Sequence, residues 1–396
     1  MKILSQIPAL AADLAGRDHP TYRQHSSTVQ REATTRAKLD RDIQALPRDD
    51  PRREPWTCCD SFSSAASAWV SSWPSVWRGW ALSPREFREV FNTYLGLPSP
   101  CVRALAGQEI WRSGTSALTK RYCDQHGQQL CLANLPGDSF RARHDAVATV
   151  VIGDVLRAGI PGCREPKTLF MHILPQPVLE RKAHCGIIPD ARLRVPELAP
   201  PLAGGPRPSR YRDCNPDYLF DVKTISAAGP CYRSAPAASM ANARPVDVRA
   251  MQVAREYETS AKRLDHQHHS SDDGPVLATL RGYPPVRGLV VGAYGEASDD
   301  VHALLKLTAA KKAETAFKEM GARTPIEAEA ILTLSLRRHW GLTFVREYAR
   351  MRLARVCFVG APRCIRTAQA FSSSHCAHDD HSVFSVHALH ARLRAH

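Results

Sequence analysis

Two short carboxylate motifs could do chemistry, because each follows directly on a hydrophobic, strand-like run. Pro189-Asp190 belongs to the first run, and Asp221-Val222-Lys223 belongs to the second. Mg²⁺ is a hard cation that prefers carboxylate, carbonyl and water oxygens. Asp190 and Asp221 can supply carboxylates, and the Val222 carbonyl can supply a third oxygen. Since such a metal activates water and polarises a phosphoryl group, the pattern predicts a Mg²⁺ or Mn²⁺ site for phosphodiester hydrolysis.

The alternation of side chains along a strand indicates which of these residues act together. Residues i and i+2 share a face, so Asp221 and Lys223 point the same way. Lys223 can then orient the attacking water or stabilise charge on the phosphate. A second pair, Pro216-Asp217, precedes Asp221 too closely to leave room for a turn and another strand. Asp190 is therefore the preferred partner, and the alternative is that these are surface loop residues.

A further acid can complete the predicted site. Residues 139–158 carry valines and leucines on roughly one face, which predicts an amphipathic helix. Asp145 and Asp154 lie on this helix, and Glu165 follows it. The sequence does not choose among the three, because each also fits an exposed or capping carboxylate.

Cysteine and histidine spacing suggests a second metal site. Cys123, His126 and Cys131 lie close together, and His144 follows. Two thiolates and two imidazoles can hold Zn²⁺ in a tetrahedral site. Buried free thiols are the alternative. His144 also fits an active-site group or a surface residue of the first helical turn.

The remaining elements follow from capping and periodicity. Ser83, Pro84 and Glu86 predict a capped helix start, with the helix ending near Gly96. The Pro- and Gly-rich insert 196–215 predicts the loop of a β-hairpin. The other expected elements are a helix over 246–266, a fourth strand over 287–294, a helix over 300–320 and two helical segments over 324–354 broken near Gly341.

The overall charge is consistent with a nucleic-acid partner. The formal net charge is +14, and arginine greatly outnumbers lysine. The planar fork of arginine binds two phosphate oxygens at once, and a basic surface favours DNA or RNA. A solvated basic surface, or a bias in the coding sequence, is the alternative.

Several classes of protein are disfavoured by what the sequence lacks. The 12 cysteines are scattered rather than framed for disulfides, which suits a reducing compartment. No run reaches the length of a transmembrane helix, and the first ten residues make a poor signal peptide. We therefore expect a nuclear or cytoplasmic protein with no membrane partner. The Walker A, GxGxxG and GxSxG patterns are missing, so no small-molecule cofactor is expected.

Pro-Asp followed by Asp-X-Lys resembles the signature of the PD-(D/E)xK nuclease superfamily. This resemblance implies an α/β, restriction-endonuclease-like fold: a mixed four-stranded sheet flanked by helices, here with extra N-terminal and C-terminal helical segments. The neighbouring motifs are similar to the restriction-like endonuclease region that lies C-terminal to reverse transcriptase in non-LTR retrotransposons. These motifs are Cys123-Asp124-Gln125-His126-Gly127 with Cys131, Arg143-His144-Asp145, Glu165-Pro166, Pro189-Asp190, Arg255-Glu256-Tyr257 with Leu264-Asp265, and the stretch from Gly288 to Glu296. The resemblance spans about residues 84–360, and no Tyr-X-Asp-Asp motif of a reverse transcriptase is present.

The resemblance implies a Mg²⁺-dependent endonuclease that nicks DNA for integration. Asp190 and Asp221 would bind the metal, and Lys223 would act at the nucleophile or the transition state. The family also has a zinc-knuckle-like motif, from which this sequence departs. Gln129 stands where a histidine is expected, and Ala133 stands where a cysteine is expected.

Two other readings stay open. A decayed element could keep the motifs yet lose the metal site, leaving a catalytically dead retroelement remnant that acts as a basic nucleic-acid-binding protein. A zinc-dependent interaction module would need four ligands to converge around Cys123. The nuclease and the decayed remnant share fold and charge, and they differ in whether Asp190, Asp221 and Lys223 converge closely enough to hold a metal.

The chain is expected to divide into five segments. The N-terminal part carries Trp56, Trp69, Trp73, Trp77 and Trp80, whose last four members lie near one helical face and favour packing over base stacking. The segments are 1–82, poorly ordered or degraded; 83–138, helical and zinc-knuckle-like; 139–320, the nuclease-like domain; 321–371, C-terminal helices; and 372–396, a His-rich disordered tail.

Overall fold

The computed structural model describes most of the chain from Ala81 to Gly360 and little before or after it. The continuous ranges are 37–47, 81–111, 118–180, 186–196, 216–227 and 244–360, with single positions Thr34, Asp50, Arg52, Arg53, Pro55, Trp69, Leu198 and Gly229. The chain forms two compact units, Met1–Thr57 and Cys58–His396. In the first unit residues 37–44 are helical. The helices and strands named below belong to the second unit. The insert 196–215, the His-rich tail and most of the tryptophans lie largely or wholly outside the described residues.

The second unit is built around a four-stranded mixed sheet in the order β3-β4-β5-β6. The pairs β3–β4 and β4–β5 are antiparallel, while β5 and β6 run parallel. A separate antiparallel pair, β1–β2, was not expected from the sequence. The strands are β1 (Glu109–Trp111), β2 (Leu118–Tyr122), β3 (Gly162–Arg164), β4 (Ala191–Arg194), β5 (Asp217–Thr224) and β6 (Arg287–Val291).

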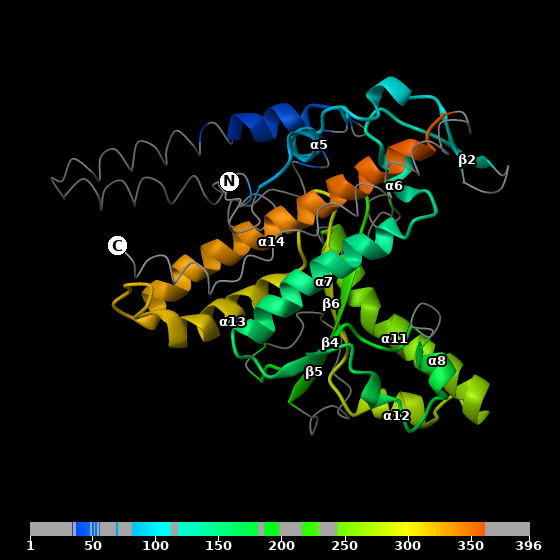
Figure 1. Ribbon diagram of the computed structural model, residues 1–396, viewed down its shortest axis with the longest axis vertical. Coiled ribbons are helices and arrows are strands. Elements are labelled where there is room, and N and C mark those ends of the chain that lie inside the picture. Colours follow the sequence, from blue (N-terminus) through cyan, green and yellow to red (C-terminus); the bar gives the residue numbers. More distant parts are fainter. Residues whose placement is uncertain are drawn as a thin grey trace, which may run out of the picture. The chain divides into compact units, whose positions relative to one another are not determined.

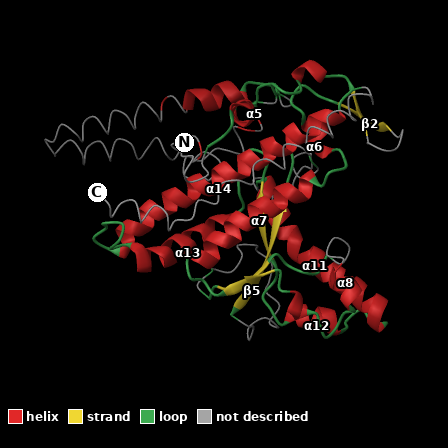
Figure 2. Ribbon diagram, viewed as in Figure 1, coloured by secondary structure: helices red, strands yellow, loops and turns green. Residues whose placement is uncertain are grey.

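Helices cover both faces of this sheet (Figures 1 and 2). One face packs against α7, α13 and α14, and the other packs against α8, α11 and α12. Along β5 the side chains alternate accordingly, with Phe220 and Val222 in the first core and Leu219 in the second. The helices are α5 (Pro84–Tyr94), α6 (Gln128–Leu132), α7 (Ser139–Arg157), α8 (Gln176–Glu180), α11 (Pro245–His269), α12 (Pro275–Arg281), α13 (Asp299–Ala316) and α14 (Pro325–Arg355), with 3₁₀ turns at Arg103–Leu105, Lys167–Leu169 and Val356–Phe358.

The coarse fold class is confirmed: a mixed sheet of four strands flanked by helices. The capped start of α5 is also confirmed, since Ser83 and Glu86 form a reciprocal capping box and Pro84 is the first helical residue. Helix α7 begins at Ser139 and ends at Arg157, close to the expected bounds. Local capping and periodicity were sufficient for these elements.

The predicted break near Gly341 is wrong, because α14 runs unbroken from Pro325 to Arg355. Glycine inside a helix costs only about 1 kcal/mol relative to alanine. Gly341 is buried together with its neighbours Trp340 and Leu342, so packing offsets that cost. The fourth strand is shorter than expected, since β6 ends at Val291.

The close packing of α11 on the sheet depends on Gly288 of β6. A Cβ at this position would lie 2.8 Å from the Cα of Ala250 on α11 and 2.8 Å from Val253 Cγ2. Glycine therefore lets the helix backbone approach the strand. This contact fixes the height of α11 above the neighbouring strand β5.

The start of α12 is capped from a distance by Asp265 of α11. The N-cap residue, Gly274, has no side chain to accept a hydrogen bond. Asp265, which is fully buried, instead accepts from the amides of Val276 (2.9 Å) and Leu277 (2.8 Å). This contact joins the last part of α11 to α12.

Replacing Asp265 with alanine should lower the free energy of unfolding by about 2 kcal/mol, since two buried amides lose their acceptor. Urea denaturation measures this loss. The matched control is Asp273→Ala, which removes an exposed carboxylate that pairs with Arg281 at 3.1 Å and should cost under about 1 kcal/mol. Equal losses in the two variants would contradict the capping role.

Within the part of the chain that the structure describes, no helix has both the length and the apolar character that crossing a membrane requires.

Candidate active site

Asp190, just before β4, and Asp221, on β5, lie side by side. Ala191 pairs with Phe220 in the antiparallel ladder of β4 and β5. Continuing this register by one residue places Asp190 opposite Asp221. Both carboxylates are buried, each with 4% of its surface exposed. The structure therefore brings together the two acids expected to hold a metal.

Asp190 lies just before β4, and its side chain hydrogen-bonds to the backbone of β5. Its Oδ2 accepts a hydrogen bond from the Val222 amide at 2.8 Å. The same oxygen lies 3.0 Å from His144 Nε2. The Val222 carbonyl as a metal ligand stays a prediction, while the Val222 amide fixes the orientation of Asp190.

Asp221 has two different oxygens. Its Oδ1 accepts a hydrogen bond from the Tyr257 hydroxyl at 3.0 Å. Its Oδ2 lies 2.6 Å from Lys223 Nζ in an ion pair, but it is buried and receives no hydrogen bond of good geometry. Burial raises the pKa of Asp221; the charge of Lys223 opposes this rise and the charge of Asp190 adds to it. Oδ2 is therefore the oxygen best placed to accept a cation.

Lys223 connects this buried pair to solvent. It lies two residues after Asp221 on β5, and a third of its side chain is exposed, against 6% for Asp221. The ammonium group can therefore contact a substrate in solvent while the aliphatic part of the Lys223 side chain packs on the sheet.

His144 belongs to this site rather than to the cysteines. It lies in the first turns of α7, and its Nδ1 lies 2.9 Å from Asp145 Oδ1 while its Nε2 faces Asp190. Burial acts to lower the pKa of His144, but hydrogen bonding and charge from Asp190, with a smaller effect of Asp145, raise it to about 9. At neutral pH the ring is therefore a cation between two carboxylates.

The neighbouring Arg143 holds the start of α7 in place. Its guanidinium is buried and donates to the carbonyls of Ile225 (3.1 Å) and Gly292 (2.9 Å). These carbonyls follow β5 and β6 directly, so the contact fixes α7 at the ends of the two parallel strands. His144 is consequently set at the height of Asp190.

The third acid is less well defined than the pair. Asp145 contacts the site through His144, and its side chain is 56% exposed. Glu165 has an exposed side chain and a positive φ of 43°, and its amide donates to the Asp190 carbonyl at 2.8 Å. Both therefore lie next to Asp190, one through a histidine and the other through the backbone.

Asp154 serves the packing of α7 against α14. It accepts from Trp340 Nε1 at 2.8 Å and from Arg157 at 2.7 Å, and it lies 3.2 Å from His339 Nδ1. Burial acts to raise the pKa of Asp154, but these three hydrogen bonds outweigh it and lower the pKa to about 2. Asp154 is therefore a structural carboxylate.

Asp154→Asn should lower stability by about 2 kcal/mol at pH 7. Because the pKa of Asp154 is depressed on folding, its contribution is fully present above about pH 4 and disappears as the pH falls toward 2. The difference in urea stability between wild type and variant should therefore shrink from pH 6 to pH 3. Asp138→Asn, at an exposed position before α7, is the control. If the stability difference between wild type and Asp154→Asn did not change with pH, the ionised form of Asp154 would not be the source of the stabilisation.

The four proposed zinc ligands are not brought together, which corrects the grouping of His144 with Cys123. His144 is held by two carboxylates, and His126 Nδ1 lies 3.2 Å from the Leu97 carbonyl. Cys123 and Cys131 are buried free thiols. Burial, with the charges of Asp124 and Cys131, raises the pKa of Cys123 to about 12, which disfavours the thiolate that zinc requires. Zinc binding by the remaining three residues stays a prediction.

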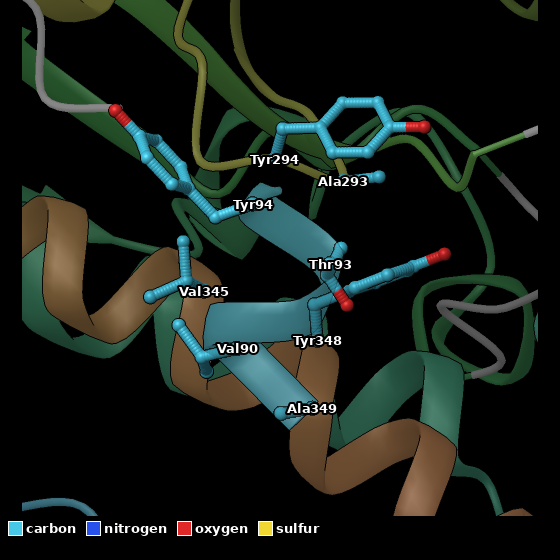
Figure 3. Close-up of a pocket in the computed structure, with 8 residues that line it drawn as sticks. All are labelled: Val90, Thr93, Tyr94, Ala293, Tyr294, Val345, Tyr348 and Ala349. Atoms are coloured by element: carbon cyan, nitrogen blue, oxygen red, sulfur yellow. The ribbon is translucent and has the colours of Figure 1, made fainter. Parts of the chain in front are cut away.

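Across the described ranges, no group of three or more His, Cys, Asp or Glu side chains is arranged to hold a metal ion. The candidate Mg²⁺ site thus rests on two carboxylates. A hollow elsewhere in the unit, between α5, α14 and the loop after β6, includes none of the site residues (Figure 3). Its lining is mostly apolar and aromatic: Val90, Thr93, Tyr94, Ala293, Tyr294, Val345, Tyr348 and Ala349.

Comparisons of the chain with protein-family models, with curated proteins and with solved structures found no match.

Proposed function

We propose that this chain is a metal-dependent endonuclease that cleaves DNA phosphodiester bonds. The observation that carries the proposal is the convergence of Asp190, Asp221 and Lys223 at one place on β4 and β5. Two buried carboxylates beside a lysine suit metal-assisted hydrolysis. Structural ion pairs also perturb acids, but here two buried carboxylates lie opposite each other on paired backbone segments with a partly exposed lysine beside them.

The donor set fits Mg²⁺ or Mn²⁺. Both acids supply hard oxygen ligands, and the buried Asp221 Oδ2 has an ion pair with Lys223 but no hydrogen bond of good geometry. A bound cation would lower the pKa of a water molecule and neutralise charge on the phosphate. It would also favour the ionised form of Asp221, whose pKa is raised in this structure.

The chain's own residues would perform the remaining tasks. Lys223 Nζ can donate a hydrogen bond to the attacking water or to a phosphate oxygen. His144 holds Asp190 through Nε2 and can add positive charge near the substrate. Asp145 orients the ring of His144 through Nδ1. Glu165 supports the Asp190 carbonyl through its amide.

The order of elements supports a restriction-endonuclease-like domain. The order α7, β3, β4, β5, α11, β6, with a final parallel strand, provides the sheet on which the PD-(D/E)xK motif is expected. The retroelement-like motifs then suggest an endonuclease derived from a non-LTR retrotransposon. The net charge of +14 supports a nucleic-acid substrate, and such a substrate fits a nuclear or cytoplasmic location.

A second candidate is a non-catalytic, basic nucleic-acid-binding remnant. One observation favours it: His144 and Lys223 already neutralise Asp190 and Asp221. A site of this kind can be stable without a metal. The two candidates differ in whether a divalent metal ion displaces His144 and Lys223 from the two carboxylates.

Nicking of supercoiled plasmid tests the proposal. The purified chain is incubated with plasmid in Mg²⁺, in Mn²⁺ and in EDTA, and open-circular DNA is measured on a gel. Metal-dependent nicking supports the endonuclease. DNA binding in a gel shift without nicking in either metal would reject it in favour of the remnant.

A further inference from the structure

Tyr257 of α11 contacts the carboxylate oxygen of Asp221 that Lys223 does not pair with. Its hydroxyl donates to Asp221 Oδ1 at 3.0 Å and lies 3.2 Å from the Ile188 carbonyl. The residue is buried, with 4% of its surface exposed. Ile188 lies two residues before Asp190, so one hydroxyl touches the segments that carry both acids.

The position of this hydroxyl is fixed by packing rather than by the site. The Tyr257 ring belongs to the apolar cluster under β5 that includes Leu219, Val253 and Ala261. Close approach of α11 to the sheet is permitted by Gly288. The ring is therefore held by the core, and its hydroxyl is a rigid donor.

We propose that Tyr257 is a positioning residue for the metal ligand Asp221, an inference that rests on the proposed function. A hydroxyl has one proton, and an ionised carboxylate is a stronger acceptor than a carbonyl. By binding Oδ1, Tyr257 fixes the carboxylate rotamer. Oδ2 is then turned toward Lys223 and the place expected for the cation.

This role was not expected from the sequence. In the sequence, Tyr257 belongs to the Arg255-Glu256-Tyr257 motif on a predicted helix. It lies 36 residues from its partner. Helical periodicity indicates that the position is apolar and buried, but it cannot indicate which acid the hydroxyl meets.

The test compares Tyr257→Phe with wild type in metal binding and in nicking. Phenylalanine keeps the ring and removes only the hydroxyl. Metal binding is measured by the rise in Tm on titration with Mn²⁺, and nicking is measured against Mg²⁺ concentration. We expect half-maximal effects to require roughly tenfold more metal in both assays, since a hydrogen bond to a charged ligand is lost. The metal-free Tm should stay within about 5 °C of wild type.

Two further variants separate the possible results. Tyr218→Phe removes the hydroxyl of a tyrosine on β5 whose ring lies under Arg287, and it should leave the metal requirement unchanged. Asp221→Asn should abolish the Mn²⁺-dependent rise in Tm.

If wild type shows no such rise and no nicking, the proposed function fails, and the role of Tyr257 fails with it. If wild type responds, Asp221→Asn does not, and Tyr257→Phe matches wild type, only the positioning role is overturned. A large fall in metal-free Tm without a changed metal requirement would also overturn it, because the hydroxyl would then serve folding alone.

Discussion

Asp221→Asn is expected to reduce metal-dependent nicking by on the order of 10³-fold or more, because metal assistance supplies several kcal/mol of transition-state stabilisation. Asparagine keeps the size of the side chain and can still accept from Tyr257. Lys223 would lose its charged partner, but its side chain is a third exposed and can remain hydrated. The fold should therefore survive, and a comparison of Tm values checks this. The measurement is the initial rate of plasmid nicking at saturating Mg²⁺.

The matched control is Asp217→Asn on the same strand. Asp217 begins β5 and lies 3.6 Å from Arg192 in a partly exposed ion pair. It also belongs to the rival Pro216-Asp217 pair, so the control tests the assignment of the motif. Asp217→Asn should nick at close to the wild-type rate. If instead this variant were inactive and Asp221→Asn retained activity, the metal centre would have to be placed around the start of β5.

The sequence predicted the strands that carry the acids because their information is local. The apolar runs 186–193 and 218–225 overlap β4 and β5, although Asp190 lies just before β4. Side-chain alternation places Asp221 and Lys223 on one face. The preference for Asp190 over Asp217 followed from spacing alone, because too few residues separate Asp217 from Asp221 for a turn and a second strand.

Features made by distant contacts could not be predicted in this way. His144 reaches Asp190 across 46 residues, and Tyr257 reaches Asp221 across 36. The sequence left His144 open among a zinc ligand, an active-site group and a surface residue, and the tertiary fold presents it to a carboxylate. The continuity of α14 at Gly341 likewise depends on burial against other helices. Local propensity is a weak guide wherever packing decides.

The buried pair Arg352–Glu89 is one such distant contact. Arg352 of α14 donates to Glu89 Oε2 of α5 at 3.1 Å and to Thr93 Oγ1 at 2.8 Å. Both charged residues are almost fully buried, with 2% and 1% exposed. Burial acts to raise the pKa of Glu89, but the charge of Arg352 and hydrogen bonds from Ser99 and Cys101 outweigh it and lower the pKa. The carboxylate thus stays ionised inside the protein.

Arg352→Met is expected to lower the free energy of unfolding by about 3–5 kcal/mol, because Glu89 is left as a buried charge without a cation. The corresponding fall in Tm is on the order of 10 °C. Arg350→Met is the matched control on the same helix, since Arg350 is 51% exposed and pairs with Glu86 nearer the surface. It should cost about 1 kcal/mol or less.

The double variant Arg352→Met/Glu89→Gln tests the cause of the loss. Glutamine is neutral, and its one oxygen can still accept from the Cys101 amide, which donates to Glu89 Oε1 at 2.8 Å, while its NH2 group can donate to the Ser99 hydroxyl, which lies 2.6 Å from Oε2. If an uncompensated charge is the reason, the double variant should recover much of the stability that Arg352→Met loses. Urea denaturation of the four proteins in the cycle gives the coupling. No recovery would mean that the loss comes from the packing of the arginine stem and its stacking on Tyr348, whose ring centroid lies 5.1 Å from the guanidinium.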